Sequence, residues 1–328
     1  MKAMTQHRYG DASALHYADV DRPEPSAGEV LVKVAAAALN HADRVDVHGL
    51  PAIARLAFGV RRPRRPIPGR AVAGTVEAVG ANVHAWTPGA AVLCETSKGG
   101  FAEYATVPAN RLAAKPDGVT FEQAATLPVA ATTALQAVRL AGLERRPGLS
   151  LLVNGASGGV GTFAVQLGRL FGARVTAVCS ARNAERALAH GATTVIDYTR
   201  ENVTRGPERY DAIIDLAGGH PTGAMRRLLR ANGVYIASYG AGGRILGPLP
   251  RLLPLAASSA THGGRLKLLV ARPDPADLVT LAAMVADGRL TPHIERVFPL
   301  SATADALHRL ETEHARGKTV IAVWSPDA

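Results

Sequence analysis

One stretch of the chain constrains its fold more than any other: Leu151-Leu152-Val153-Asn154-Gly155-Ala156-Ser157-Gly158-Gly159-Val160-Gly161. Apolar residues precede a glycine-rich turn, and a helix-compatible run over 162–171 follows it. Glycine allows a backbone to turn tightly and to approach a ligand that a Cβ would exclude. The unpaired N–H groups at a helix start suit a pyrophosphate. The pattern therefore predicts a strand–turn–helix that binds a dinucleotide through Gly155, Ser157, Gly158, Gly159, Val160 and Gly161.

The residues after this turn continue to alternate between strand and helix patterns. Apolar runs predict strands over 174–179, 193–198, 210–217 and 233–238, and helical patterns over 184–190 and 222–230 separate them. A glycine-rich turn alone is also typical of an ordinary tight loop, but this alternation is typical of a parallel sheet with both faces covered. We predict an α/β fold with a Rossmann doubly wound parallel sheet over residues 123–272.

The end of the second predicted strand indicates which nicotinamide cofactor binds. An acidic residue there usually holds the ribose 2′-hydroxyl of NAD. Here the sequence over 178–183 is VCSARN, and the first acid is Glu185, inside the next helix. Ser180 can donate a hydrogen bond and Arg182 can pair with a 2′-phosphate, although a solvated arginine at a helix start is the alternative. These residues favour NADPH over NADH.

Three further residues are assigned to the cofactor site. Tyr198 ends the third predicted strand and can contribute a phenol. We also assign Leu216 and Tyr239 to cofactor binding.

Length and composition indicate two domains and no membrane span. The 328 residues support a large core, and no run of 18 apolar residues lacks charge. The N-terminus lacks the apolar core of a signal peptide. Cys94 and Cys179 lie in separate predicted units, as reduced core thiols would. We expect a cytoplasmic protein.

The net charge of +10 is due almost wholly to arginine, since all but six of the 37 basic side chains are arginine. One cluster stands out: Arg55, Arg61, Arg62, Arg64, Arg65 and Arg70. It can be a solvated loop, or an electropositive rim that attracts a small anionic substrate. Phe58 is the nearby aromatic residue and no nucleic-acid motif occurs, so we do not expect nucleic-acid binding.

The first 120 residues follow a different pattern. Alternating residues over 29–34, 71–79 and 101–107 predict short strands separated by proline and glycine turns. Thr120 and Gln123 form a capping-box pattern that predicts a helix start. A further helix is predicted over about 132–141. This is the pattern of an irregular β-rich domain.

Several motifs, in this order, resemble a known family: Leu39–Asp43, Pro68–Gly74, Gly99–Tyr104, Gly155–Gly161, Ile196–Tyr198 and Gly317-Lys318. Together they resemble the zinc-independent, quinone oxidoreductase-like branch of the medium-chain dehydrogenase/reductase superfamily. The resemblance covers essentially the whole chain. It implies a GroES-like catalytic domain over 1–122 and 273–328. It also implies a homodimer in which a strand at about 265–271 pairs across subunits.

The metal ligands of zinc-dependent relatives are missing. Asn40 stands where they use cysteine, and Arg70-Ala71 stands where they use His-Glu. A catalytic zinc needs three protein ligands and an open position, so we expect no metal. Ala71 also departs from the zinc-free branch, which commonly has an aspartate there.

Without a metal, hydrogen-bond donors must stabilise the charge that grows on the substrate oxygen during hydride transfer. The family pattern places Asn40 near the nicotinamide, although an asparagine that caps a loop is the alternative. Thr133 matches a family threonine near the cofactor, and Lys318 is assigned to the cofactor site. His41 and His48 titrate near neutrality, so either can supply a proton.

Two classes of function remain open. The first is an NADPH-dependent reductase of quinones, enones or ketones, including an enone reductase that tailors a specialised biosynthetic intermediate. The second is a non-catalytic NADPH-binding protein. An intact glycine-rich turn does not separate them, because both bind cofactor.

Overall fold

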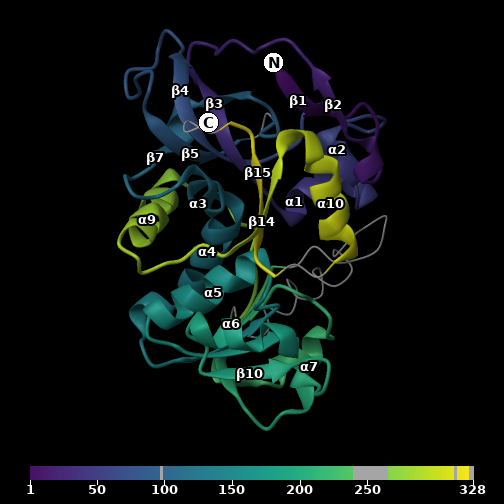
Figure 1. Ribbon diagram of the computed structural model, residues 1–328. Helices are drawn as coiled ribbons and strands as arrows, with labels where there is room; N and C mark the ends of the chain where they lie inside the picture. Colours follow the sequence, from purple (N-terminus) through teal and green to yellow (C-terminus); the bar gives the residue numbers. More distant parts are fainter. Residues whose placement is uncertain (97–98, 239–264, 314–315, 325–328) are drawn as a thin grey trace. The chain divides into compact units, whose positions relative to one another are not determined.

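The structure is a computed structural model that describes residues 1–96, 99–238, 265–313 and 316–324 (Figure 1). The chain divides into two compact units. The first consists of Met1–Thr132 and Pro273–Ala328, and the second of Thr133–Arg272. Each unit is described separately below.

A seven-stranded sheet forms the centre of the first unit. Its longest strand, β3 (Glu29–Leu39), pairs antiparallel with β4 (Ala71–Val79) along one edge. Along its other edge, β3 pairs first with β6 (Tyr104–Pro108) and then with β15 (Lys318–Ala322). The strand β3 therefore joins segments from both ends of the chain.

The other regular elements of the first unit surround this sheet. They are β1 (Lys2–Thr5), β2 (His16–Asp19), β5 (Ala91–Glu95), β7 (Leu112–Ala114), β14 (Ile294–Pro299), α1 (His41–His48), α2 (Arg55–Phe58), α3 (Phe121–Ala125), α9 (Pro275–Ala286) and α10 (Thr303–Thr312). The strands β1 and β2 pair with each other in a separate two-stranded sheet. Helix α3 packs on β3 and β4, so residues 123–132 lie with the first unit and not at the start of the Rossmann domain.

Strand β3 is longer than the sequence predicted. The predicted strand ended at Val34, whereas β3 continues through Ala35–Ala38 to Leu39. Alanine has low strand propensity, but all four alanines are at most 2% exposed. The pairing of Ala36–Ala38 with strands on both edges outweighs that local preference. The strand expected from Phe101 begins instead at Tyr104, as β6.

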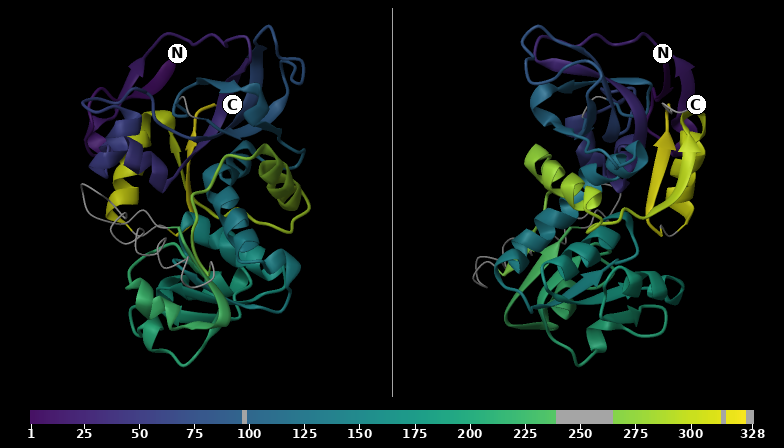
Figure 2. Two further views of the ribbon diagram at one scale, coloured as in Figure 1. Left: turned by 180° about the vertical axis from the view of Figure 1, so that it is seen from behind. Right: turned by 60° about the vertical axis from the view of Figure 1, so that its left-hand side comes forward.

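The C-terminal segment returns to the first unit. Figure 2 shows β14, α10 and β15 (yellow) beside the N-terminal elements (purple). In the register of β15 with β3, Thr319 lies opposite Leu39. Lys318 is consequently next to Asn40, the residue that follows β3.

The predicted helix start at Thr120 is confirmed, but the helix is short. The Gln123 backbone N–H donates to Thr120 Oγ1 at 3.2 Å, and the Thr120 N–H donates to Gln123 Oε1 at 3.0 Å. A kinked turn over 127–131 follows α3, with Val129 at φ +66° and ψ −63°. A positive φ in a β-branched residue costs about 1–3 kcal/mol. Its chain neighbours Leu127 and Ala130 are both buried, so the turn lies within the packed part of the unit.

The second unit is a six-stranded parallel sheet in the order β10-β9-β8-β11-β12-β13. Its elements are α4 (Thr132–Leu140), β8 (Ser150–Asn154), α5 (Gly159–Leu170), β9 (Arg174–Cys179), α6 (Ala184–Ala189), β10 (Thr194–Asp197), β11 (Tyr210–Asp215), α7 (Thr222–Arg226), β12 (Leu229–Ala237) and β13 (Leu266–Leu268). Helix α5 packs on β8 and β9, and α6 on β9 and β10 (Figure 1). The predicted Rossmann-type sheet is confirmed.

The helix predicted over 222–230 is wrong in its second half. Helix α7 ends at Arg226, and β12 begins at Leu229. A glycine is typical of the end of a helix, but Gly233 lies within β12, beside a register shift in the pairing with β11. A Cβ at Gly233 would lie 2.9 Å from the Tyr210 carbonyl oxygen. The glycine therefore permits two strands to approach closely.

Candidate functional site

The glycine-rich turn connects β8 to α5 and leaves no room for a side chain at residue 161. Gly155 has φ +88°, a conformation that favours glycine. A Cβ at Gly161 would lie 2.1 Å from the Gly155 carbonyl oxygen. Gly158 is the N-cap of α5, and no described side chain caps the helix. The N–H groups of its first turn are thus available to an anion, which fits a dinucleotide pyrophosphate.

A buried polar network fixes the strand ends around this turn. Asp215, at the end of β11, is 0% exposed. Its Oδ1 accepts from Asn154 Nδ2 at 2.8 Å and from the Gly218 N–H at 2.9 Å. Its Oδ2 accepts from the Tyr235 hydroxyl at 2.7 Å. The network ties β8, β11 and β12 together where the strand order reverses, the place where ligands bind in such sheets.

The residues predicted to select NADPH lie at neighbouring strand ends. Cys179 at the end of β9 is opposite Asp197 at the end of β10, so the register brings Ser180 and Tyr198 close together. Ser180 is 9% exposed and its hydroxyl accepts from Asn183 Nδ2 at 3.2 Å. Arg182 is exposed and Tyr198 is 46% exposed.

Leu216 and Tyr239 were also predicted to bind the cofactor, and the structure describes only the first of them. The Leu216 N–H donates to the Asn154 carbonyl oxygen at 3.0 Å, and its Cβ lies 3.4 Å from the position of a Cβ at Gly155. Leu216 therefore lies against the glycine-rich turn. Tyr239 lies outside the described residues.

In the first unit, Asn40 and Lys318 form a buried pair. Asn40 is 6% exposed and Lys318 is 2% exposed. Lys318 Nζ donates to Asn40 Oδ1 at 2.5 Å and to the Leu39 carbonyl oxygen at 2.8 Å. Asn40 Nδ2 donates to the Ala38 carbonyl oxygen at 2.9 Å. An ammonium only donates, so it fixes the orientation of the Asn40 amide.

Asp43 extends this pair into a network of three residues. Its Oδ2 accepts from the Asn40 backbone N–H at 2.7 Å, whereas its Oδ1 has no partner among the described residues. Burial raises the pKa of Asp43 to about 7, and the negative charge of Asp46 adds to the rise. Burial lowers the pKa of Lys318 to about 8, against the attraction of Asp43. Both groups therefore titrate close to neutral pH.

The two candidate histidines have different surroundings. His41 begins α1 and its side chain is exposed. Partial loss of hydration, followed by the charge of Arg44, lowers the pKa of His41. His48 ends α1, and its Nε2 lies 2.5 Å from Glu311 Oε1 on α10. This hydrogen bond gives His48 a structural partner, and neither histidine is part of the Asn40 network.

Thr133 belongs to the second unit, near the start of α4, and is 8% exposed. The structure brings together Asn40 and Lys318 in the first unit. In the second it gathers the glycine-rich turn, Leu216 and the residues that follow β9 and β10.

Sequence reasoning missed the partner of Arg70. Arg70 Nε donates to Asp46 Oδ2 at 2.8 Å, and its Nη2 donates to Asp46 Oδ1 at 2.9 Å. The spacing of Asn40, Asp43 and Asp46 could have indicated that one face of a helix bears two carboxylates. It could not have indicated that Arg70, from a distant loop, reaches that face.

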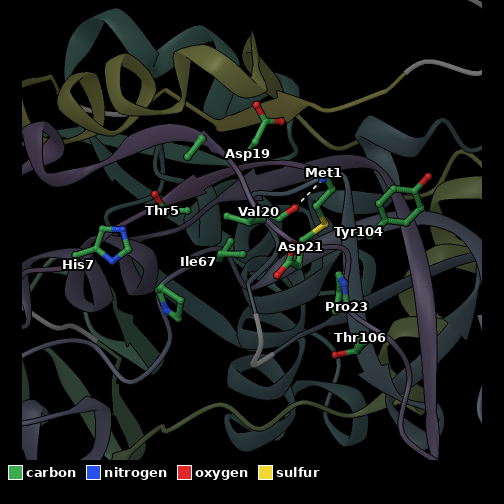
Figure 3. A pocket seen from close by; sticks show the side chains of 12 residues that line it. Met1, Thr5, His7, Asp19, Val20, Asp21, Pro23, Ile67, Tyr104 and Thr106 are labelled. Carbon is green, nitrogen blue, oxygen red and sulfur yellow. Dashed lines mark hydrogen bonds between the residues drawn. The ribbon is translucent and has the colours of Figure 1, made fainter.

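Two cavities of the first unit share Ile67 in their linings. The cavity beside Arg70 has a volume of about 360 Å³ and is also lined by Asp46, Phe58, Arg64 and Arg65. The other, of about 530 Å³, lies between β1, β2 and β6 (Figure 3). Its charged lining includes Asp19 and Asp21, and Met1 N donates across it to the Val20 carbonyl oxygen at 2.7 Å.

Within the part of the chain that the structure describes, no three His, Cys, Asp or Glu side chains gather as a metal site would require. The residues at the positions of the zinc ligands are committed elsewhere. Asn40 accepts from Lys318, and Arg70 is paired with Asp46.

Comparison with known proteins extends these observations to the whole chain. Residues 26–117 match the alcohol dehydrogenase GroES-like domain, and residues 190–321 match a family described as zinc-binding dehydrogenase. A chloroplast envelope quinone oxidoreductase homolog from Arabidopsis thaliana is 33% identical over 342 residues, covering 98% of each chain. A chloroplastic NADPH-dependent alkenal/one oxidoreductase from the same plant is 32% identical, covering 98% of this chain and 79% of its own.

A solved structure is similar throughout. The quinone oxidoreductase from Coxiella burnetii superposes with a TM-score of 0.85 at 29% identity, covering 98% of this chain and 99% of its own. The expected combination of a GroES-like domain with a Rossmann-type parallel sheet is therefore confirmed.

The buried carboxyl of Asp43 predicts a specific pH dependence of stability. An unfolded aspartate has a pKa of 3.8, and Asp43 in the folded protein has a pKa of about 7. Between these values the folded state retains a proton that the unfolded state has released, so stability falls as the pH rises through this window. The Asp43→Asn variant lacks this dependence.

The measurement is the free energy of unfolding of wild type and variant by denaturant titration at several pH values. The stability of wild type relative to Asp43→Asn should decline from about pH 4 to about pH 7 and then level off. Exposed Asp117, changed to asparagine, is the control and should leave the wild-type pH dependence unaltered. A difference that stays constant across the window would contradict the assignment.

Proposed function

The chain belongs to the quinone oxidoreductase-like branch of the zinc-independent medium-chain dehydrogenases/reductases, and on that premise we propose that it is an NADPH-dependent reductase of a quinone, an enone or a ketone. The observation that supports this most directly is the buried Lys318–Asn40 pair. It places a cation beside the residue that stands where zinc-dependent relatives use a metal-binding cysteine. Reduction of the C=C bond of an enone is included because one relative is named an alkenal/one oxidoreductase.

The chemistry of the pair suits an acceptor that gains negative charge on oxygen. When bound, NADPH supplies the hydride. Lys318 has three N–H donors, of which two are given to Asn40 and Leu39. Asn40 Nδ2 has two, of which one is given to Ala38. Each side chain thus retains a donor for a substrate oxygen, and their mutual hydrogen bond fixes both beforehand.

Protons can be held within the same network. At neutral pH, Asp43 is near its pKa of about 7 and Lys318 near its pKa of about 8. Lys318 Nζ is therefore suited to release a proton to an oxygen that becomes more basic during reduction. His41 and His48 stay in the proposal as alternative proton donors.

The first test is turnover. NADPH oxidation should be followed with a panel of quinones and enones in wild type, Asn40→Ala and Lys318→Met. Removing one preorganised donor should lower kcat by about 10²-fold. Lys33→Met is the matched control, because Lys33 is a partly buried lysine in the same sheet that lies over the Trp324 ring.

His41→Ala and His48→Ala belong in the same series. The variant that removes the proton donor should lose one limb of the pH–rate profile. No turnover in wild type with any quinone, enone or ketone would favour a non-catalytic NADPH-binding protein. Full kcat in Lys318→Met would remove Lys318 from the mechanism.

Preference for NADPH over NADH is part of the same proposal. We expect NADPH to bind at least about tenfold more tightly, since one charge-assisted contact from Arg182 to a 2′-phosphate suffices. Titration of both cofactors into wild type and Arg182→Ala measures this. Arg174→Ala is the control, because Arg174 begins β9 whereas Arg182 follows its other end. Equal affinities in wild type would refute the preference.

A homodimer is proposed on the edge of the six-stranded sheet. Strand β13 ends the order of strands in that sheet, and beside it Leu268 is 41% exposed and Val270 is 72% exposed. An exposed apolar edge strand is a template for pairing with a second chain. The molecular mass by light scattering should be that of a dimer, and Val270→Lys should shift it towards the monomer. A monomeric wild type would overturn this part.

The proposal also keeps a cytoplasmic location. Cys94 and Cys179 are both free and buried, as in a reducing compartment. No helix among the described residues is long and apolar enough to cross a membrane. Fractionation of the source cells measures the location.

A further inference from the structure

The cavity beside Arg70 has an excess of positive charge that hydride transfer alone does not require. Its lining includes Arg64, Arg65 and Arg70, against one carboxylate, Asp46. We propose that this cavity binds an oxyanion group of the substrate, either a carboxylate or a phosphate, through these three arginines. The inference rests on the proposed reductase function, because it specifies the class of substrate.

The backbone fixes the position of Arg70. Its carbonyl oxygen accepts from the Thr96 N–H at 2.7 Å. The preceding Gly69 has φ +101°, and its carbonyl oxygen accepts from the Gly100 N–H at 2.8 Å. A Cβ at Gly69 would lie 2.6 Å from the Phe101 nitrogen. Arg70 is therefore held between two closely packed segments at the entry to β4.

The side chain of Arg70 is oriented but not saturated. A guanidinium has five N–H donors, and two of them go to Asp46. Phe58 supports its face, with the guanidinium carbon 5.7 Å from the ring centroid. The closest approach to Glu95 is 4.0 Å, from Nη1 to Oε1, which is beyond hydrogen-bond length. Arg70 thus retains donors in a fixed plane, the geometry that matches a carboxylate or phosphate.

Two carboxylates lie near Arg70: Asp46, which it binds through two hydrogen bonds, and Glu95, at 4.0 Å. Both carboxylate oxygens of Asp46 accept from Arg70. Burial raises the pKa of Glu95, although the charges of Arg70 and Arg111 act in the opposite direction. A ligand therefore meets free donors on Arg70, while Gln6 Oε1 is a buried acceptor of the lining that has no partner among the described residues.

The rim of the cavity adds charge without counter-charge. Arg64 and Arg65 are exposed, and the ion pairs among the described residues include neither. A neighbouring hollow of about 400 Å³ is lined by Arg62 and Arg64. Such an electropositive rim raises the local concentration of anions, and its attraction for them weakens as salt is added.

The second cavity of the first unit shows that this charge is local. Figure 3 shows Asp19, Asp21, Tyr104 and His7 around it. Lys2 pairs with Asp19 at 2.6 Å, which leaves Asp21 as an acidic group in the lining. The Met1 ammonium also lines this cavity, so its carboxylates are partly balanced, and no arginine is among its lining residues. The two cavities share Ile67, but of the two only the one beside Arg70 is lined by arginines.

Size and wall chemistry limit the ligand further. A volume of about 360 Å³ is at the lower end of small-molecule sites. Phe58, Ile67 and Pro68 form apolar walls next to the arginines. The fitting substrate is a compact apolar quinone or enone that bears a carboxylate or a phosphate.

The experiment combines kinetics with binding in the absence of turnover. NADPH-dependent reduction of 3-benzoylacrylate is compared with that of its uncharged methyl ester. Binding of benzoate, phenyl phosphate and neutral benzamide to the full chain without cofactor is measured by calorimetry. We expect the acid to have a KM about tenfold below that of the ester, and benzoate or phenyl phosphate to bind where benzamide does not.

Variants locate the effect. Combining Arg64→Ala with Arg65→Ala should weaken anion binding about tenfold without disturbing the buried Lys318–Asn40 pair. Arg70→Met should abolish anion binding. Arg61→Ala is the matched control, because Arg61 is an exposed arginine of the same segment that lines neither cavity. The thermal melting temperature separates loss of binding from loss of folding in Arg70→Met.

Each outcome of these measurements supports or contradicts the anion site. Tighter binding of benzoate than of phenyl phosphate supports a carboxylate substrate, and the reverse order supports a phosphate. Equal binding of benzoate and benzamide, or an unchanged affinity in the Arg64/Arg65 variant, overturns the inference. If both enones are reduced equally while benzoate fails to bind, the reductase stands and the anion site falls. If benzoate binds at the arginines but no enone, quinone or ketone is reduced, the anion site stands and the reductase function falls.

Discussion

The pairing of β15 with the end of β3 is the interaction on which the first unit depends. It places Thr319 opposite Leu39, and so seats the Lys318 ammonium against the Leu39 carbonyl and the Asn40 amide. A buried lysine is costly unless it is hydrogen-bonded. The antiparallel register offsets that cost, because it places two hydrogen-bond acceptors from adjacent residues next to the Lys318 ammonium. Without this strand, the start of α1 would lack both its cation and one edge of its supporting sheet.

Much of the second unit could be predicted from the sequence, because its signals are local. A strand, a glycine-rich turn and a helix follow one another within a few residues, and the strand over 174–179 has the predicted bounds. Parallel sheets with covered faces read as near-continuous apolar runs, which periodicity detects. The prediction of a helix to Arg230 was wrong because a glycine can end a helix or lie in a strand, and the close contact of Gly233 with Tyr210 places it in a strand.

The first unit could be predicted less well, because its decisive contacts join distant segments. The sequence around Asn40 does not indicate that Lys318 is its partner, and the sequence around Arg70 does not indicate that Asp46 is its partner. Alanine has a low propensity for strands, and the four alanines of β3 lie in a strand because of tertiary contacts with distant segments. The kinked turn at Val129 likewise opposes local preference, and its chain neighbours are buried. The family resemblance identified Asn40 and Lys318 as site residues, but not that they bind each other.

The tight contact between Gly161 and the Gly155 carbonyl oxygen limits how this protein can change. Any side chain at residue 161 would have to push the glycine-rich turn away from the start of α5, so the packing between the turn and the helix would be lost. Loss of cofactor affinity and loss of folded structure are thus inseparable at that position. Under the proposed NADPH preference, substitutions that weaken cofactor binding and spare the fold would fall at exposed positions such as Arg182, where a side chain can be lost without moving the backbone.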